Sequence, residues 1–356
     1  MIEIPIEKTT QSKLSQVDFN NLVFGSTFTD HMFDMEYRDG KWQNPRIIPY
    51  GPIQIEPGMS VLHYGQAIFE GSKAFYTKDG RINVFRMNKN FERLNCSAKR
   101  LCIPDIEEDV YYTAIKKLIL LEKAWVPKDR GTALYIRPFI FASESFLGVR
   151  PSKTYRFMVI LCPVGPYYAE GFNPVKLSTS GEYGRAFQGG VGNAKAAANY
   201  AISLFPANEA KKQGFTQVVW LDAKEHRYVE EVGTMNLFCY LDDTLITPPL
   251  DEGTILPGVT RESVIHIARD MGIPVCERKI AIEELFDAAE KGTLKEIFGS
   301  GTAAVISPVG ELHHKGQTIK INGGKTGELA QKMFDEITGI QYGEKSDTNN
   351  WCHYLD

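Results

Sequence analysis

The segment with the clearest chemical potential is Gly189–Tyr200, which reads GGVGNAKAAANY. Most lysines lie in water, but Lys195 stands between small residues that let another molecule approach the backbone closely. A desolvated ammonium group loses its proton more easily, and a neutral amine is the nucleophile that Schiff-base chemistry on an aldehyde requires. The alternative is an ordinary solvated lysine, and the local composition leaves it open.

Two other segments could bind an anion. Ile255–Gly272 (ILPGVTRESVIHIARDMG) predicts a helix with Thr260 as its N-cap, so that the amides of Val259 and Thr260 would face an anion. Phe298–Ala304 (FGSGTAA) predicts a tight turn that presents Thr302 and backbone amides. An ordinary capped helix and a plain turn are the alternatives to these sites.

A carboxylate and an arginine complete the candidate residues. Tyr228–Phe238 (YVEEVGTMNLF) places paired glutamates beside an apolar run, and one buried glutamate facing a pyridine nitrogen would keep that nitrogen protonated. Tyr135 and Arg137 are two residues apart on a predicted strand and therefore share a face. Arg137 needs an anionic partner, which could be a substrate or an internal salt bridge.

Strands and helices must position these groups. Apolar spacing predicts helices over Asn88–Leu101, with Asn88 as N-cap, and over Glu107–Lys123. Gly165–Pro174, rich in glycine and proline, is the best candidate for a domain connection. The expected domains are 1–165 and 176–356, joined by 166–175. Strands are expected at 81–86, 132–142, 155–164, 216–221, 226–230, 236–240 and 244–247.

The composition narrows the class of protein. The 356 residues are 43% hydrophobic and 24% charged, with a formal net charge of -4, which is ordinary for a globular protein. No basic stripe suggests nucleic acid as a partner, and no apolar run is long enough for a membrane span. The six cysteines are scattered without C-x-x-C spacing, so no metal site is expected. These features favour a cytoplasmic enzyme that acts on small molecules.

The order of these motifs resembles one family along nearly the whole chain. The blocks DHMFDM, LHYGQAIFEGSKAF, FERLNCSAKRLCIP, YIRPFIFA, GGVGNAKAAANYA, EEVGTMNLF, LPGVTR and GSGTAAVISPVG are similar to those of branched-chain aminotransferases, which are class IV (fold-type IV) pyridoxal-phosphate enzymes. The resemblance implies a mixed α/β fold of two domains, a smaller N-terminal α/β domain and a larger C-terminal pseudo-barrel domain. It also implies a homodimer with pyridoxal 5′-phosphate as cofactor.

The resemblance carries cofactor-binding roles onto matching positions of this chain. Lys195 matches the Schiff-base lysine, which also moves the substrate proton, and Arg93 matches an arginine that binds the phosphate. Glu231, rather than Glu230, matches the partner of the pyridine nitrogen, and Tyr200 matches the residue that binds the 3-oxygen of the cofactor. The remaining cofactor-binding residues that the resemblance implies are Thr234, Val259, Thr260 and Thr302.

Other matching positions are implied to bind the substrate. The aromatic lining of the side-chain pocket corresponds to Tyr64, Phe69, Tyr135 and Tyr167. Arg137 matches a residue that handles a substrate carboxylate, and the amides of Thr302 and Ala303 would hold the α-carboxylate. One departure is Ala304–Ser307 (AVIS), where mammalian members carry a redox-sensitive C-x-x-C, so that form of thiol regulation should be absent.

The implied activity is reversible transfer of the amino group from L-leucine, L-isoleucine or L-valine to 2-oxoglutarate by a ping-pong mechanism. The nearest alternative is a D-amino-acid aminotransferase or an aminodeoxychorismate-lyase-like enzyme of the same fold. A scaffold protein without catalytic activity is a third hypothesis, although a scaffold would have no need for Lys195, Glu231 and Arg93.

Overall fold

The computed structural model describes residues 2–165 and 172–355, which form two compact units. The first unit consists of Met1–Tyr167, Ala194–Ala198 and Ile340–Asp356, and the second of Tyr168–Asn193 and Asn199–Gly339. The lysine segment and the C-terminal segment therefore pack with the N-terminal part of the chain. The predicted domain limits at 165 and 176 stay a prediction, and the first six residues of the predicted connection lie outside the described residues.

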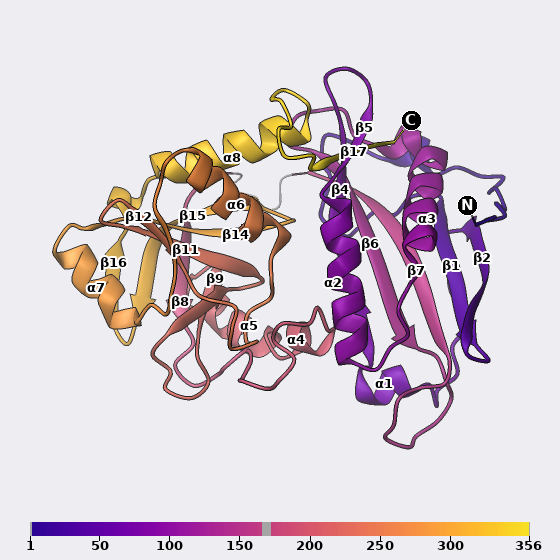
Figure 1. Cartoon of the computed structure of the whole chain (residues 1–356), viewed down its shortest axis with the longest axis horizontal. Coiled ribbons are helices and arrows are strands. Elements are labelled where there is room, and N and C mark those ends of the chain that lie inside the picture. The colour runs from indigo at the N-terminus through magenta and orange to yellow at the C-terminus, as the bar shows by residue number, and fades with distance from the viewer. Residues whose placement is uncertain (1, 166–171, 356) are drawn as a thin grey trace. The chain divides into compact units, whose positions relative to one another are not determined.

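The first unit is built on an eight-stranded antiparallel sheet in the order β17-β5-β4-β6-β7-β1-β2, with β3 also paired to β6 (Figure 1). Its strands are β1 (His31–Arg38), β2 (Lys41–Pro49), β3 (Ala67–Phe69), β4 (Ser72–Tyr76), β5 (Ile82–Phe85), β6 (Ala133–Ala142), β7 (Tyr155–Val164) and β17 (Cys352–Leu355). Its helices are α1 (Ser60–Tyr64), α2 (Met87–Arg100) and α3 (Glu108–Leu121), with short 3₁₀ turns at Leu14–Gln16 and Lys123–Trp125. Apolar side chains of α2, α3 and one sheet face form the core of this unit.

The predicted N-cap at Asn88 is wrong, because α2 begins one residue earlier. Arg86 lies in the left-handed region (φ 53°), and its N–H donates to the carbonyl oxygen of Trp351 (2.6 Å), which extends the pairing of β5 with β17. The chain turns from the strand directly into Met87, so Asn88 already lies within the helix. A strand contact with the far end of the chain thus decides where the helix begins.

The second unit contains a nine-stranded sheet that closes on itself (Figure 1). The path β10-β9-β8-β15-β14-β11 ends at β11, which pairs with β10, so six strands form a closed ring. The strands are β8 (Val175–Thr179), β9 (Gln217–Leu221), β10 (Val229–Val232), β11 (Met235–Leu241), β12 (Thr244–Thr247), β13 (Val275–Glu277), β14 (Leu294–Gly301), β15 (Val305–His314) and β16 (Gln317–Lys320). The ring corresponds to the predicted pseudo-barrel.

The remaining helices are α4 (Ala198–Ala201), α5 (Leu204–Lys212), α6 (Val259–Asp270), α7 (Ile282–Glu290) and α8 (Glu328–Gln341), with a 3₁₀ turn at Asn322–Gly324. Helix α6 confirms the predicted helix, but its N-cap is Gly258, so the prediction of Thr260 is wrong. A side chain cannot occupy that cap, because a Cβ on Gly258 would lie 1.9 Å from Oδ1 of Asn236. None of the helices in the described part of the chain is long and apolar enough to cross a membrane.

Candidate active site

Lys195 lies in a short extended segment of the first unit that pairs with β3. Its carbonyl oxygen accepts the N–H of Phe69 (3.1 Å), and its own N–H donates to Oγ of Ser97 on α2 (2.9 Å). The flanking residues Ala194 and Ala196 are buried, and Nζ of Lys195 lies 4.8 Å from the centre of the Phe69 ring. The small neighbours noted in the sequence therefore allow this segment to lie against both a strand and a helix.

The surroundings of Lys195 favour its neutral form. Burial, together with the positive charges of Arg93 and Arg137, lowers the pKa of Lys195 to about 8. Glu70 and Tyr135 act in the opposite direction but do not restore the ordinary value. A larger share of the amine is therefore unprotonated near neutral pH than for a lysine in water, as nucleophilic attack requires.

Arg93 projects from α2 and forms a buried ion pair with Glu70. Its Nε and Nη2 lie 2.8 and 2.9 Å from the two carboxylate oxygens of Glu70. Asn90 donates a further hydrogen bond to Glu70 (2.7 Å), and the N–H of Gly71 another (3.2 Å). Burial alone would raise the pKa of Glu70, but the charge and hydrogen bonds of Arg93 hold it below its ordinary value. Glu70 therefore fixes the guanidinium group of Arg93 in place.

Three of the predicted substrate residues lie together on the first unit's sheet. The guanidinium of Arg137 lies 4.6 Å from the Phe69 ring centre, and its Nη2 donates to the hydroxyl of Tyr135 (3.2 Å). This contact confirms that Tyr135 and Arg137 share a face of β6. Tyr64 instead lies on α1, 46% exposed, where its hydroxyl donates to the carbonyl oxygen of Leu147. The predicted Tyr167 lies outside the described residues.

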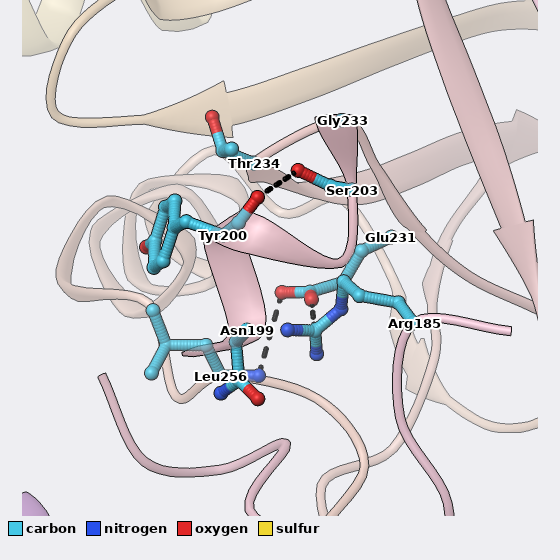
Figure 2. A pocket seen from close by; sticks show the side chains of 8 residues that line it. All are labelled: Arg185, Asn199, Tyr200, Ser203, Glu231, Gly233, Thr234 and Leu256. Carbon is cyan, nitrogen blue, oxygen red and sulfur yellow. Dashed lines mark hydrogen bonds and ion pairs between the residues drawn. The ribbon is translucent and has the colours of Figure 1, made fainter. Parts of the chain in front are cut away.

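In the second unit, three of the predicted cofactor residues line one pocket (Figure 2). These are Tyr200, Glu231 and Thr234. The other lining residues, which the sequence did not indicate, are Arg185, Asn199, Ser203, Gly233 and Leu256. Asn199 reaches back to donate to the carbonyl oxygen of Val191 (2.8 Å), within the glycine-rich segment before the lysine. The pocket is thus assembled from the loop before α4, from α4 and the residues that follow it, from β10 and its turn to β11, and from the loop before α6.

Glu231 forms a buried ion pair with Arg185 at this pocket, and Figure 2 shows the two side chains meeting. Nη2 of Arg185 lies 2.5 Å from Oε2 of Glu231 and also donates to the carbonyl oxygen of Thr254 (2.5 Å). A Cβ on Gly192 would lie 2.3 Å from that same carbonyl oxygen, so only glycine allows the chain to pass there. The negative charge of Glu231 is therefore offset by the guanidinium of Arg185, which a backbone carbonyl group holds in place.

Asn236 on β11 connects the separate parts of this half of the site. Its Nδ2 donates to Oε1 of Glu231 (3.2 Å) and to the carbonyl oxygen of Leu256 (2.9 Å), just before α6. Asn236 also pairs with Ser300 at the end of β14. One buried amide thus links the carboxylate, the approach to α6 and the turn that carries Thr302.

Helix α6 and the turn between β14 and β15 present the predicted anion-binding groups. Val259 and Thr260 form the first turn of α6, the end of a helix at which negative charge is stabilised. Thr302 and Ala303 lie in the turn between Gly301 and Val305, which pair with each other. Val305 has φ 63°, a left-handed conformation that a β-branched residue adopts only at a cost in energy. The turn is therefore held in a strained form.

Sequence reasoning missed Glu70, Arg185 and Asn236. Glu70 was visible as a charged residue within the run AIFEG, and Asn236 as a polar residue within MNLF. A charged or amide group in an apolar run is buried only with a partner, and that rule could have drawn attention to both. Nothing in the sequence around Arg185 connected it with Glu231.

The groups present fit a pyridoxal-phosphate cofactor. The second unit offers a buried carboxylate at a pocket and an N-terminal helix turn whose cap position has no room for a side chain. The hydroxyl of Ser300, beside the turn, is buried without a hydrogen-bond partner among the described residues. The first unit offers a lysine with a lowered pKa and a buried arginine. In the described part of the chain no cluster of His, Cys, Asp and Glu could hold a metal ion.

Comparison with known proteins gives a family match and close relatives. The amino-transferase class IV family matches residues 67–312. Branched-chain-amino-acid aminotransferase 2 of Bacillus subtilis (strain 168) is 51% identical over 343 residues, which cover 96% of this chain and 94% of the relative. The relatedness thus extends over both compact units.

Solved structures give the same result. The crystal structure of the Escherichia coli branched-chain amino acid aminotransferase matches with a TM-score of 0.76 at 27% identity, and covers 92% of this chain and 99% of that chain. The T.th. branched-chain amino acid aminotransferase, complexed with N-(5′-phosphopyridoxyl)-L-glutamate, matches with a TM-score of 0.73 at 26% identity, and covers 90% and 98%. The ligand of that second structure combines the cofactor skeleton with an amino acid.

Proposed function

Because the chain belongs to the class IV aminotransferases, and within them to the branched-chain-amino-acid aminotransferases, we propose that it exchanges amino groups between L-leucine, L-isoleucine or L-valine and 2-oxoglutarate. The products are the branched 2-oxo acid and L-glutamate. The family, the enzyme class and the fold-type IV architecture expected from the sequence are confirmed. The observation that carries the proposal is Lys195, whose amine is shifted towards its neutral form beside Phe69 and the Arg93–Glu70 pair.

Pyridoxal 5′-phosphate is the cofactor, and when bound it supplies an electron sink for the bond to the substrate α-carbon. We assign its phosphate to Arg93, to the amides of Val259 and Thr260 and to the hydroxyl of Thr302. Tyr200, Glu231 and Thr234 line the pocket that would take the ring. These assignments are proposals that rest on the matching motifs and on the groups each unit presents.

The protein side chains divide the proton transfers. Nζ of Lys195 would take the proton from the substrate α-carbon and pass it on, which needs an amine that titrates near neutral pH. Glu231 holds a proton at the ring nitrogen, because its carboxylate is buried and fixed by Arg185. The two half-reactions share this machinery, which gives ping-pong kinetics.

The substrate side chain is assigned to Phe69, Tyr135, Tyr64 and Tyr167, and the second carboxylate of 2-oxoglutarate to Arg137. The stacking of Arg137 on Phe69 supports this, because one surface then offers both an aromatic face and a charge. The amides of Thr302 and Ala303 would hold the α-carboxylate. A difference of one methylene group changes transition-state binding by only about 1–3 kcal/mol, so all three branched amino acids should be accepted.

A homodimer is the proposed assembly. The loop after β6 exposes large apolar side chains, including Leu147 and Val149, the latter 85% exposed. Apolar groups gathered in this way are typical of a surface that another chain covers. Sedimentation of the purified protein would test it, since a monomer at micromolar concentration would contradict the proposal. The cytoplasmic location stays a prediction.

The visible spectrum of the purified protein tests the activity. We expect the absorbance of lysine-bound cofactor, its loss on adding L-leucine, and its return on adding 2-oxoglutarate. Lys195→Ala should abolish this cycle, whereas Lys211→Ala on the exposed surface of α5 should leave it unchanged. Bleaching by D-alanine but not by L-leucine would favour the D-amino-acid aminotransferase instead. A protein that stays colourless with added cofactor would favour the scaffold.

A further inference from the structure

Glu230 is a second buried carboxyl group next to Glu231, and the transamination outlined above does not use it. Its side chain is 4% exposed, and Oε2 has no hydrogen-bond partner among the residues that the structure describes. A buried carboxyl group with an unsatisfied oxygen costs free energy, so it is seldom kept without a role.

Strand β10 has a bulge at the two successive glutamates, Glu230 and Glu231. Along a regular strand, neighbouring side chains point to opposite faces. In β10, Val229 pairs with Leu221 and Val232 with Val219, so β10 has one more residue than β9 over this stretch. The extra residue lies at Glu230–Glu231, and bulges of this kind redirect side chains next to active sites.

Thr254 joins Glu230 to the Arg185–Glu231 pair. The hydroxyl of Thr254 donates a hydrogen bond to the carboxyl group of Glu230, and its carbonyl oxygen accepts one from Nη2 of Arg185. Nε of Arg185 is buried and has no hydrogen-bond partner in the described part of the chain. The guanidinium thus has one nitrogen engaged by Glu231 and another without a partner among the described residues, and its charge also acts on Glu230.

The charges around Glu230 place its titration in the physiological range. Burial raises the pKa of Glu230 to about 7, although a hydrogen bond from Thr254 and the positive charge of Arg185 act to lower it. The negative charges of Glu231 and Asp222 act in the same direction as burial. Asp222 itself accepts hydrogen bonds from backbone N–H groups of the loop before β10, including that of Tyr228 (2.7 Å).

We propose that Glu230 is a positioning residue of the cofactor site, which controls how the charge of Arg185 is divided between two carboxyl groups. This inference rests on the proposed function, in which Glu231 holds a proton at the ring nitrogen. With Glu230 neutral, Arg185 is committed to Glu231 and offsets its negative charge. When Glu230 gives up its proton to solvent, the two carboxylates share one guanidinium, and the potential at Glu231 becomes more negative. Glu231 then binds a protonated ring nitrogen more tightly.

The test compares the wild-type protein with Glu230→Gln, which keeps the shape and the Thr254 hydrogen bond but cannot ionise. The matched control is Glu296→Gln in the same unit, a buried carboxylate that accepts the N–H groups of Leu329 and Ala330 at the start of α8. One measurement follows neutral carboxyl groups by infrared difference spectroscopy of the holoprotein across pH. The other measures the affinity of the apoprotein for pyridoxamine 5′-phosphate, which forms no bond with Lys195.

We expect the wild type and Glu296→Gln to lose a neutral carboxyl band near pH 7, and Glu230→Gln to lack that transition. The affinity for pyridoxamine 5′-phosphate at about pH 8.5 relative to about pH 6 should be about fivefold lower in Glu230→Gln than in the wild type. Thr254→Val should move the titration of Glu230 upward, and it replaces Glu230→Gln if that variant does not fold.

A carboxyl transition that persists in Glu230→Gln would overturn the assignment of the titrating group. An unchanged pH dependence of affinity would overturn the role of Glu230, even if its own titration were found. Failure of the proposed function looks different: no coloured holoprotein would form in any variant, while the infrared transition of Glu230 in the apoprotein would remain.

Discussion

Each compact unit buries an arginine–glutamate pair, and the two pairs are arranged in opposite senses. In the first unit the carboxylate of Glu70 is fully buried and accepts hydrogen bonds from Arg93, Asn90 and Gly71. In the second unit both partners line a pocket, and the carbonyl oxygen of Thr254 accepts a hydrogen bond that holds the guanidinium of Arg185. We therefore propose that the first unit offers its cation, Arg93, to a ligand, and the second unit its anion, Glu231.

Arginine and glutamate also respond differently to burial when a partner is lost. An arginine stays charged in a protein, so Arg93 depends on Glu70 at every accessible pH. A glutamate can take up a proton, so Glu231 can adjust to the loss of Arg185. The first unit's pair should thus be mainly a structural requirement, and the second unit's pair mainly an electrostatic one.

The largest expected effect is on catalysis, from Glu231→Gln. Without a carboxylate at the pocket, the ring nitrogen loses its proton-holding partner, and kcat/KM for L-leucine should fall about 10²- to 10⁴-fold. Steady-state kinetics with 2-oxoglutarate would measure this. Glu70→Gln is the matched variant, with an expected loss below about tenfold, because Arg93 keeps a side-chain oxygen acceptor. Equal losses in both variants would contradict the opposite senses of the two pairs.

The next effect concerns stability, from Glu70→Ala. Removing this carboxylate leaves a buried, permanently charged arginine, and should lower the free energy of unfolding by about 3–5 kcal/mol. Urea unfolding would measure the change. Glu92→Ala, which breaks the exposed pair with Lys89 on α2, should change it by about 1 kcal/mol or less.

Arg185→Ala sharpens the same contrast. The loss in the free energy of unfolding that Arg185→Ala causes should become smaller as the pH falls, because Glu231 can then become neutral. The loss caused by Glu70→Ala should not become smaller in this way. Unfolding curves at several pH values would show the difference, and parallel pH profiles for the two variants would rule it out.

A smaller effect comes from the pH dependence of stability at Glu230. Its pKa is about 7 in the folded protein against an ordinary value of 4.5, so the folded state binds this proton more tightly than the unfolded state. The stability it contributes is present below about pH 4.5 and is lost as the pH rises through about 7, by up to about 3 kcal/mol. Glu230→Gln should therefore be more stable than the wild type at about pH 8, with the advantage disappearing in acid. Thermal unfolding at both pH values checks this, and an advantage independent of pH would contradict it.

The smallest effect is expected from Gly71→Ala beside the substrate residues of the first unit. A Cβ there would lie 2.0 Å from the hydroxyl oxygen of Tyr135, so the Tyr135 side chain must shift and its hydrogen bond with Arg137 is disturbed. We expect KM for L-leucine to rise about tenfold with little change in kcat. Gly51→Ala is the control, because a Cβ on Gly51 meets no atom within 4 Å. An unchanged KM would show that Tyr135 does not line the substrate site.

Local sequence patterns predicted those elements whose own residues favour a helix or a strand. The segment Ile255–Gly272 predicted α6, and Gly272, with φ 73°, follows the last turn as glycine commonly does at the end of a helix. The strand at Tyr155–Val164 has the predicted bounds, because its apolar and β-branched residues suit a buried strand. The helix caps were harder to predict from the sequence. Arg86, before α2, donates a hydrogen bond to Trp351, and Gly258, before α6, lies close to Asn236. Both partners are distant in sequence.

The sequence by itself predicted the family, the cofactor class and the role of Lys195 through the order of its motifs, because each motif is a run of neighbouring residues that can be read without the fold. Only the tertiary structure decided the partners of the charged groups. It paired Arg93 with Glu70 and Arg185 with Glu231, and a bulge in β10 brought Glu230 under the influence of the same arginine. The reason is physical: a buried charge is stabilised by whichever partner the fold brings within a few ångströms, and spacing along the chain does not encode that choice.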